Sequence, residues 1–155
     1  MVRTAIAIAA LMLSAGGALA QGTALPTGDA TAGEQVFKKC TVCHSIGPGA
    51  TNKIGPELNG VLGRTAGTLP GYNYSQAMKD AGAGGLVWTP ETLTKFLTKP
   101  RDFVPGTKMT FPGLPNPQDI ANVIAYIATF SPDYKPGAAP AAAPAAEPAP
   151  ATPAQ

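Results

Sequence analysis

The chain has 155 residues, of which 45% are hydrophobic and 13% are charged, with 17 prolines and 18 glycines. Eleven Lys and Arg residues stand against nine Asp and Glu residues, and this near-neutral balance argues against nucleic acid as a partner. The length favours one small folded domain whose core is too small to give more than marginal stability by burial alone.

The first 20 residues are typical of a cleavable export signal. Arg3 precedes an apolar run over residues 4–13, and Ala18-Leu19-Ala20 supplies the small residues that a signal peptidase requires. The run is shorter than the stretch of about 20 apolar residues that a membrane-spanning helix needs. We therefore expect a signal peptide over residues 1–20, export to the periplasm, and a mature chain that begins at Gln21 and holds ten basic and nine acidic residues once Arg3 is removed.

The predicted folded domain covers residues 27–134 and contains several helix signals. Asp29 is a suitable N-cap for a helix over residues 30–39. A short helix is expected over residues 75–82. Thr89-Pro90-Glu91 combines an N-cap, a proline in the first turn and an early acid, which predicts a helix that continues to about Thr98 and ends at Pro100.

The clearest helix follows Asn116, where apolar residues recur at the helical period. The residues concerned are Ile120, Val123, Ile124 and Ile127. This stripe requires a packing partner, and the first helix is suitable because Gly33 permits a close approach of two backbones. Turn-forming residues dominate positions 40–71, and no alternating strand pattern appears. The fold class is therefore predicted as all-α, with four to five helices and long loops.

Residues 136–155 consist almost wholly of Ala and Pro and include no large apolar side chain. Such a segment cannot build a core, and frequent proline favours extended conformations. We expect a disordered, solvated tail.

The chain has two cysteines and one histidine, and they form the sequence Cys40-Thr41-Val42-Cys43-His44. Two thiols at this spacing can add to the two vinyl groups of a haem, while the adjacent imidazole ligates the iron. Two alternatives use the same cysteines. A redox-active Cys-x-x-Cys pair needs no histidine. A zinc site would need a further ligand, such as a carboxylate. The adjacent His44 favours covalently attached haem c over both.

A haem in an electron carrier needs a second axial ligand, and the mature chain offers Met78 and Met109 as thioethers. Met78 lies in a predicted helix, where methionine usually fills gaps in the core. Met109 ends Pro105-Gly106-Thr107-Lys108-Met109, a loop in which Pro and Gly can hold an unusual backbone path. Met109 is therefore the predicted ligand opposite His44, and a thioether ligand raises the reduction potential.

The sequence resembles the class I cytochromes c, a family of small haem proteins, and in particular the soluble periplasmic bacterial forms and mitochondrial cytochrome c. The resemblance covers about residues 28–130. Besides the haem motif, its landmarks are Gly33 to Cys40, Gly55-Pro56-Glu57-Leu58-Asn59-Gly60, Gly63-Arg64, Gly71-Tyr72-Asn73-Tyr74, Trp88 and Pro105 to Met109. It implies the small cytochrome c fold, wrapped around one haem attached through Cys40 and Cys43.

Specific roles follow from this resemblance. His44 and Met109 are implied as the iron ligands, with the Pro56 carbonyl accepting a hydrogen bond from the imidazole of His44. Tyr74 and Trp88 are implied as donors to a haem propionate. The remaining implied roles are Arg64 near that propionate, and Gly33, Phe37 and Tyr126 at the contact between the first and last helices.

The chain departs from the family pattern at two positions beside the ligating methionine. Met78 stands where mitochondrial members carry Asn, and Phe96 stands where a Tyr is common. Both changes make that side of the haem more apolar. Met78 also provides a second possible ligand if the Met109 loop loosens.

The resemblance implies a monomeric one-electron carrier rather than an enzyme, since an iron with six ligands has no open position for a substrate. The expected partners are membrane or periplasmic redox proteins, such as an oxidase, a reaction centre, a cytochrome bc-type complex or a dehydrogenase. The predicted docking cations are Lys39, Lys53, Lys99, Arg101 and Lys108. The alternatives are a peroxidase-like enzyme, if the Met ligand is displaced, and a sensor.

Overall fold

The computed structural model describes residues 27–136, so the expected signal peptide and all but the first residue of the expected tail lie outside it. Within the described part the chain forms five helices and no strand, which confirms the predicted all-α class. The helices are α1 (Ala30–Phe37), α2 (Gln76–Ala83), α3 (Pro90–Thr98), α4 (Pro100–Phe103) and α5 (Pro117–Ala128). None of these helices has the length and apolarity to cross a bilayer.

Side-chain N-caps begin four of the helices, among them the two predicted at Asp29 and Thr89. The Asp29 side chain accepts a hydrogen bond from the backbone N–H of Ala32 at 2.6 Å and so caps α1. Ser75, Thr89 and Asn116 cap α2, α3 and α5 in the same way.

The short helix α4 was not predicted. Pro100 was expected only to end the preceding helix, but it also occupies the first turn of α4. Its missing N–H costs nothing there, because the first N–H groups of a helix have no partner within the helix.

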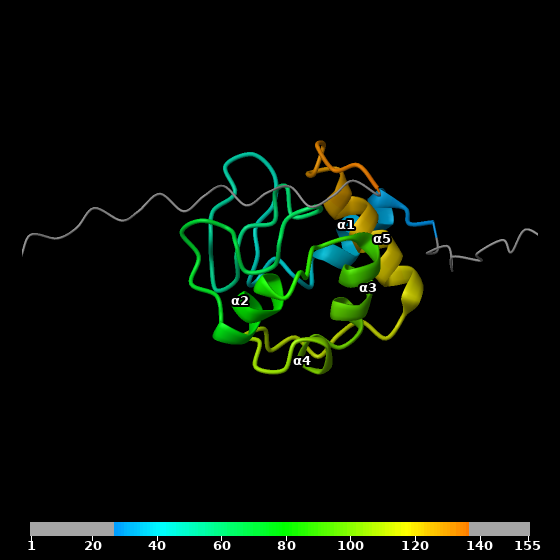
Figure 1. The fold of residues 1–155 in the computed structure, drawn as a ribbon. Helices are drawn as coiled ribbons and strands as arrows, with labels where there is room; N and C mark the ends of the chain where they lie inside the picture. Colours follow the sequence, from blue (N-terminus) through cyan, green and yellow to red (C-terminus); the bar gives the residue numbers. More distant parts are fainter. Residues whose placement is uncertain (1–26, 137–155) are drawn as a thin grey trace, which may run out of the picture.

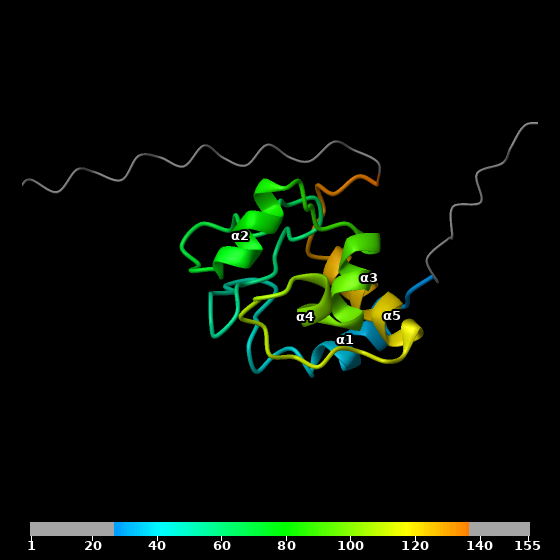
Figure 2. The same cartoon turned by 60° about the horizontal axis from the view of Figure 1, so that its bottom comes forward.

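Helices α1, α3 and α5 gather on one side of the molecule, and α2 and the long loop over residues 38–75 lie on the other (Figures 1 and 2). Helix α5 packs against both α1 and α3, and α3 also contacts α4. The loop is joined to the segment before α3 by an isolated antiparallel bridge between Thr65 and Val87.

The crossing of α1 and α5 depends on a glycine. A Cβ at Gly33 would overlap the carbonyl oxygen of Asn122 and lie 2.8 Å from Cβ of Tyr126. Phe37 and Tyr126 pack ring against ring beside it, with centroids 5.3 Å apart. The buried Asn122 side chain accepts a hydrogen bond from the backbone N–H of Asp29 at 2.9 Å. The predicted contact between the first and last helices is therefore confirmed.

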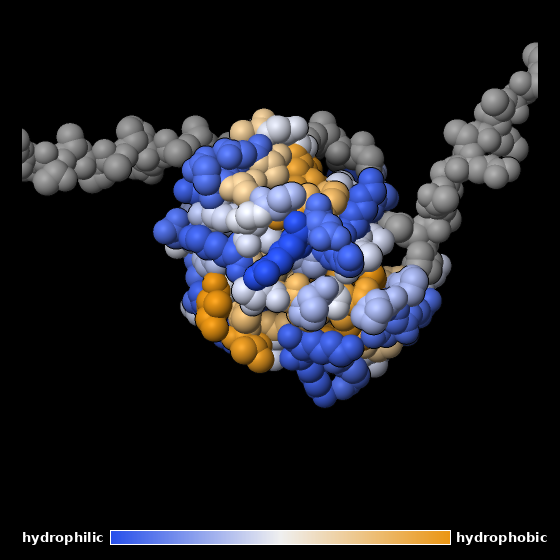
Figure 3. Space-filling view, turned by 90° about the horizontal axis from the view of Figure 1, so that it is seen from below, coloured by the Kyte–Doolittle hydropathy of each residue, from blue (hydrophilic) through white to orange (hydrophobic). Residues whose placement is uncertain are grey.

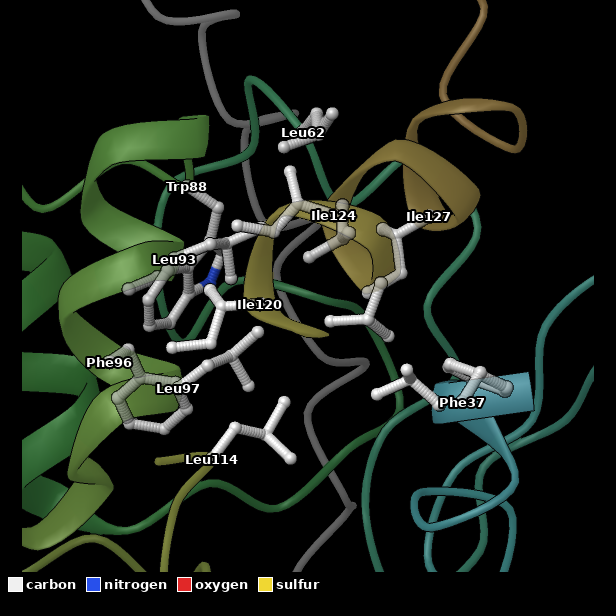
Figure 4. Packing of buried hydrophobic residues seen from close by; sticks show 14 of the residues in the cluster. Phe37, Leu62, Trp88, Leu93, Phe96, Leu97, Leu114, Ile120, Ile124 and Ile127 are labelled. Atoms are coloured by element: carbon white, nitrogen blue, oxygen red, sulfur yellow. The ribbon is translucent and has the colours of Figure 1, made fainter. Parts of the chain in front are cut away.

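The hydrophobic core lies between α5 and α3 and extends to Phe37 of α1 (Figure 4). The predicted apolar stripe of α5 is buried, with Val123 only 1% exposed. From α3, Leu93, Phe96 and Leu97 face it. Trp88 packs against Phe96, with ring centroids 5.0 Å apart.

Candidate functional site

A cavity of about 400 Å³ opens between the two sides of the molecule, within the range of roughly 300–1,000 Å³ typical of ligand sites. Its walls come from the end of α1, the long loop, α2, α3, the loop after α4, and α5. All eight predicted site residues line it: Cys40, Cys43, His44, Pro56, Arg64, Tyr74, Trp88 and Met109. The fold therefore brings together residues that lie up to 69 positions apart in the sequence (109 minus 40).

The segment after α1 holds the two cysteines and the histidine in one compact turn. The backbone N–H of Cys40 donates to Phe37 at 2.7 Å, and the N–H groups of Cys43 and His44 donate to the carbonyl of Cys40 at 3.0 and 2.8 Å. Both thiols are partly buried. The local chain path thus places two thiols and one imidazole at the same cavity.

A hydrogen bond at Nδ1 fixes the orientation of the imidazole of His44. Nδ1 lies 2.7 Å from the carbonyl oxygen of Pro56, and because a carbonyl only accepts, Nδ1 carries the proton. This tautomer leaves the lone pair of Nε2 free for a metal. Burial lowers the pKa of His44 below its ordinary value, although the bond to Pro56 partly opposes this, so the ring is neutral at pH 7.

Gly55 allows this arrangement, and its role was not predicted from the sequence. A Cβ at this position would overlap Cε1 of His44 and lie 2.8 Å from both ring nitrogens. The signal for this role in the sequence is the position of Gly55 directly before Pro56, whose carbonyl accepts the hydrogen bond from His44. The backbone here must pass close to the ring, which only glycine permits.

The thiol chemistry argues against the redox-active alternative. Burial raises the pKa of the Cys40 thiol to about 11, although Lys39 partly offsets this, whereas reactive Cys-x-x-Cys pairs depend on a lowered thiol pKa. Zinc has no support either. No group of three or more His, Cys, Asp and Glu side chains among residues 27–136 is placed to hold a metal ion.

Arg64 is held at the cavity by the chain itself. Its Nη1 donates to the carbonyl of Asn59 at 3.1 Å, and its guanidinium lies 4.0 Å from the carboxylate of Glu57. Tyr74 is half-buried nearby, and this burial raises its pKa, while Arg64 acts in the opposite direction. Trp88 is 7% exposed, and its indole nitrogen makes no hydrogen bond to another residue in the described part of the chain. Two donors and a cation thus face one cavity.

Both methionines of the described chain reach this cavity. Met109 is half-buried in the loop after α4, and Met78 is 7% exposed in α2. The loop is attached to the segment around α2, since Lys108 Nζ donates to the carbonyl of Asn73 at 2.9 Å. A Cβ on Gly106 would lie 3.1 Å from Cβ of Ala77, so the two segments are in contact. Met78 therefore lies beside the loop that carries Met109.

The predicted docking cations are not equally placed. Lys39 and Lys108 line the cavity, and Lys53 lines a smaller adjacent hollow, whereas Lys99 and Arg101 line neither. The outlying pair lies at the junction of α3 and α4.

Internal partners reduce the free charge of these cations. Lys39 lies 3.5 Å from Asp119, and Lys99 lies 3.2 Å from Asp102. Exposed pairs of this kind contribute little to stability, but each leaves less positive charge for a partner. On the face shown in Figure 3, hydrophobic patches interrupt a largely hydrophilic surface.

The fold and site define a small all-α protein whose core surrounds a mainly apolar cavity with two cysteines and one histidine in its wall. The model of the family described as "Cytochrome c" matches residues 30–131. The cytochrome c2 of Agrobacterium tumefaciens is 55% identical over 100 residues, which are 64% of this chain and 90% of that protein. The cytochrome c2 of Afifella marina is 53% identical over 102 residues, or 66% and 82% of the two chains.

A solved structure of cytochrome c2 from Rhodospirillum centenum has a TM-score of 0.66 and 44% sequence identity, and the match covers 68% of this chain and all of that one. The chain belongs to the cytochrome c family, and it has the small cytochrome c fold. It is an electron-carrying cytochrome that holds haem c covalently through its two cysteines.

The residues of the cavity fit this cofactor. Its walls are mainly apolar, two thiols stand at the spacing needed for thioether bonds, and one imidazole presents an unprotonated nitrogen. Arg64, Tyr74 and Trp88 add a cation and donors that suit carboxylate groups. The chemistry that the haem supplies is a reversible one-electron change at iron.

Proposed function

We propose that this chain is a soluble periplasmic one-electron carrier in which His44 and Met109 are the axial ligands of the haem iron. The observation that carries the proposal is the meeting of an imidazole with a free Nε2 lone pair and a loop thioether in one cavity. Two strong protein ligands leave no open position, so electron transfer is favoured over substrate chemistry. The chain then provides orientation, a dry apolar environment and a docking face.

The residues around the cavity have distinct proposed tasks. Pro56 holds the tautomer of His44 and makes the imidazole more basic through its hydrogen bond. Tyr74 and Trp88 donate to a propionate, and Arg64 offsets its charge. Burial of Arg64 lowers its pKa, but a guanidinium remains protonated at pH 7.

The ligand assignment is tested with two methionine variants. Met109→Ala should remove the far-red sulfur-to-iron charge-transfer band of the oxidised protein and lower the reduction potential, because the thioether is lost. Met78→Leu is the matched control, since it also replaces a cavity-lining thioether, and it should keep the band. A band that survives in Met109→Ala and disappears in Met78→Leu would assign the ligand to Met78.

The proposed partners are acidic redox proteins of the membrane or periplasm: an oxidase, a reaction centre, a cytochrome bc-type complex or a dehydrogenase. Lys39, Lys53 and Lys108 lie nearest the cavity and are the proposed centre of the docking charge. Association steered by charge slows as salt increases. Second-order rates with a purified oxidase should therefore fall with ionic strength, and rates that ignore it would contradict this docking mode.

Export is tested on the protein isolated from its cells. We expect the holoprotein in the periplasmic fraction, with Gln21 as its N-terminal residue by mass spectrometry, because cleavage after Ala20 follows the signal-peptide pattern. A chain that retains Met1 and fractionates with the cytoplasm would contradict the proposed location.

A further inference from the structure

Glu57 is an acidic residue that pairs with one of the residues lining the haem cavity. Its carboxylate lies 4.0 Å from the guanidinium of Arg64, and the two side chains are only 17% and 18% exposed. In the pair of Lys39 with Asp119, by contrast, the side chains are 55% and 31% exposed. The pair of Glu57 and Arg64 is therefore the one ion pair of residues 27–136 that is largely shielded from water.

The backbone holds both members of this pair in place. Oε2 of Glu57 accepts a hydrogen bond from the N–H of Asn59 at 2.8 Å, and the N–H of Glu57 donates to the side chain of Asn52 at 3.0 Å. The guanidinium of Arg64 donates to the carbonyls of Asn59 at 3.1 Å and of Glu57 at 3.5 Å. The two charges are thus fixed by separate hydrogen bonds, and the carboxylate of Glu57 is not needed to hold the guanidinium in position.

The wall of the cavity carries positive charge and no carboxylate. Lys39, Arg64 and Lys108 line it, whereas no Asp or Glu side chain of the described residues does. The oxidised haem iron carries one more positive charge than the reduced iron. A nearby cation therefore disfavours the oxidised state, and a nearby anion favours it.

The opposing effects of Glu57 and Arg64 are visible at a third residue of the site. Burial raises the pKa of Tyr74, and of the two charges Arg64 lowers this pKa whereas Glu57 raises it further. Tyr74 lines the cavity. The field of the Glu57 carboxylate therefore reaches the cavity wall, although Glu57 itself is not part of that wall.

We propose that Glu57 is a potential-setting residue, whose fixed carboxylate opposes the positive charge of Arg64 and lowers the reduction potential of the haem. The inference rests on the proposed carrier function and concerns the driving force of electron transfer. Glu57 acts by its charge and not by contact, because it does not line the cavity. A partly buried charge suits this task, since salt screens it much less than a charge in solvent.

The test uses the full holoprotein with Glu57→Gln, which removes the charge but keeps an oxygen that can accept from the N–H of Asn59. Glu57→Asp is the conservative variant, because it keeps the charge on a side chain that is one methylene shorter. Asp119→Asn is the matched control, because it also removes a carboxylate paired with a cavity-lining cation, but from an exposed pair. Reduction potentials are measured by redox titration at pH 7, at low and at high salt, and the far-red sulfur-to-iron band is recorded for each variant.

We expect Glu57→Gln to raise the equilibrium constant for reduction about threefold to tenfold, where tenfold corresponds to about 59 mV for a one-electron couple. The shift should be nearly the same at low and high salt, because the pair is shielded from water. Glu57→Asp and Asp119→Asn should both stay within about twofold of the wild type, the first because its charge remains and the second because an exposed charge is screened. The far-red band should persist in all three variants.

Several results would overturn the proposal. A wild-type potential in Glu57→Gln would show that this charge does not act on the haem. An equal rise in Glu57→Asp would show that the position of the side chain matters and its charge does not, and an equal rise in Asp119→Asn would show that burial of the pair is irrelevant. A shift accompanied by loss of the far-red band would assign the effect to a changed iron ligand.

The same titration separates this inference from the carrier function on which it rests. A wild type that shows no reversible one-electron titration would refute the carrier function and the inference together. A wild type that titrates reversibly, with an unaffected Glu57→Gln variant, would refute the role of Glu57 alone.

Discussion

Gly33→Ala tests the close approach of α1 and α5. The added Cβ would lie 2.6 Å from the carbonyl carbon of Asn122 and 2.8 Å from Cβ of Tyr126, whereas carbon atoms in favourable contact are about 3.5–4.0 Å apart. The overlap is about 1 Å. Because the nearest atoms belong to the backbone of Asn122, no side-chain rotation relieves it, and the two helices must separate.

The expected loss of stability follows from two opposing effects. Overpacking of this kind costs about 1–3 kcal/mol and occasionally more, while alanine in place of glycine within a helix contributes about 1 kcal/mol in the opposite direction. A backbone overlap belongs at the upper end of the cost. We therefore expect the free energy of unfolding to fall by about 2 kcal/mol, measured by urea denaturation of the holoprotein with circular dichroism.

Gly84→Ala is the control for this prediction. Gly84 follows α2 with φ of −75°, a conformation that alanine accepts, and its added Cβ would meet only carbonyl oxygens of its own helix, at 3.3 and 3.4 Å. This variant should stay within about 0.5 kcal/mol of the wild type. If Gly33→Ala is as stable as the Gly84→Ala protein, the proposed dependence of the helix crossing on Gly33 is wrong.

Three further substitutions test the site and its support. Gly55→Ala should push the His44 ring from its place and add a high-spin component to the spectrum of the oxidised holoprotein, and a wild-type spectrum would contradict this. Asn122→Ala should cost about 1–3 kcal/mol in urea denaturation, because the backbone N–H of Asp29 loses its acceptor, and an unchanged midpoint would refute this. Burial raises the pKa of Tyr74 above its ordinary value of 10.0, so the folded chain holds the phenol proton more tightly than the unfolded chain does. The free energy of unfolding should therefore fall as pH rises above about 10. Tyr74→Phe should make this fall less steep.

Local chemistry explains which parts of the fold could be predicted. The starts of four helices follow from N-cap residues, whose side chains act within three positions, and the stripe of α5 follows from the helical period. The helix α4 was missed because Pro100 is compatible both with the end of one helix and with the start of another.

Contacts between distant segments could not be predicted in the same way. The role of Gly55 depends on where the ring of His44 lies, and the pairing of Lys39 with Asp119 joins residues 80 positions apart. The exposure of Val42 and Ile54 likewise could not be read from the sequence, because apolar residues are usually expected in the core. A sequence motif names the residues of a site, but the backbone path determines their neighbours.

The cavity walls and the hydrophobic core are largely the same residues, Phe37, Trp88 and Leu97 among them, so the haem is itself the centre of the packing. Without the haem, the apolar walls of this space of about 400 Å³ would face water, and at about 25 cal/mol per Å² each apolar surface left exposed lowers the stability of the fold. Loss of the haem would therefore remove the common contact of helices that meet the cavity from different sides, and not merely empty a binding site.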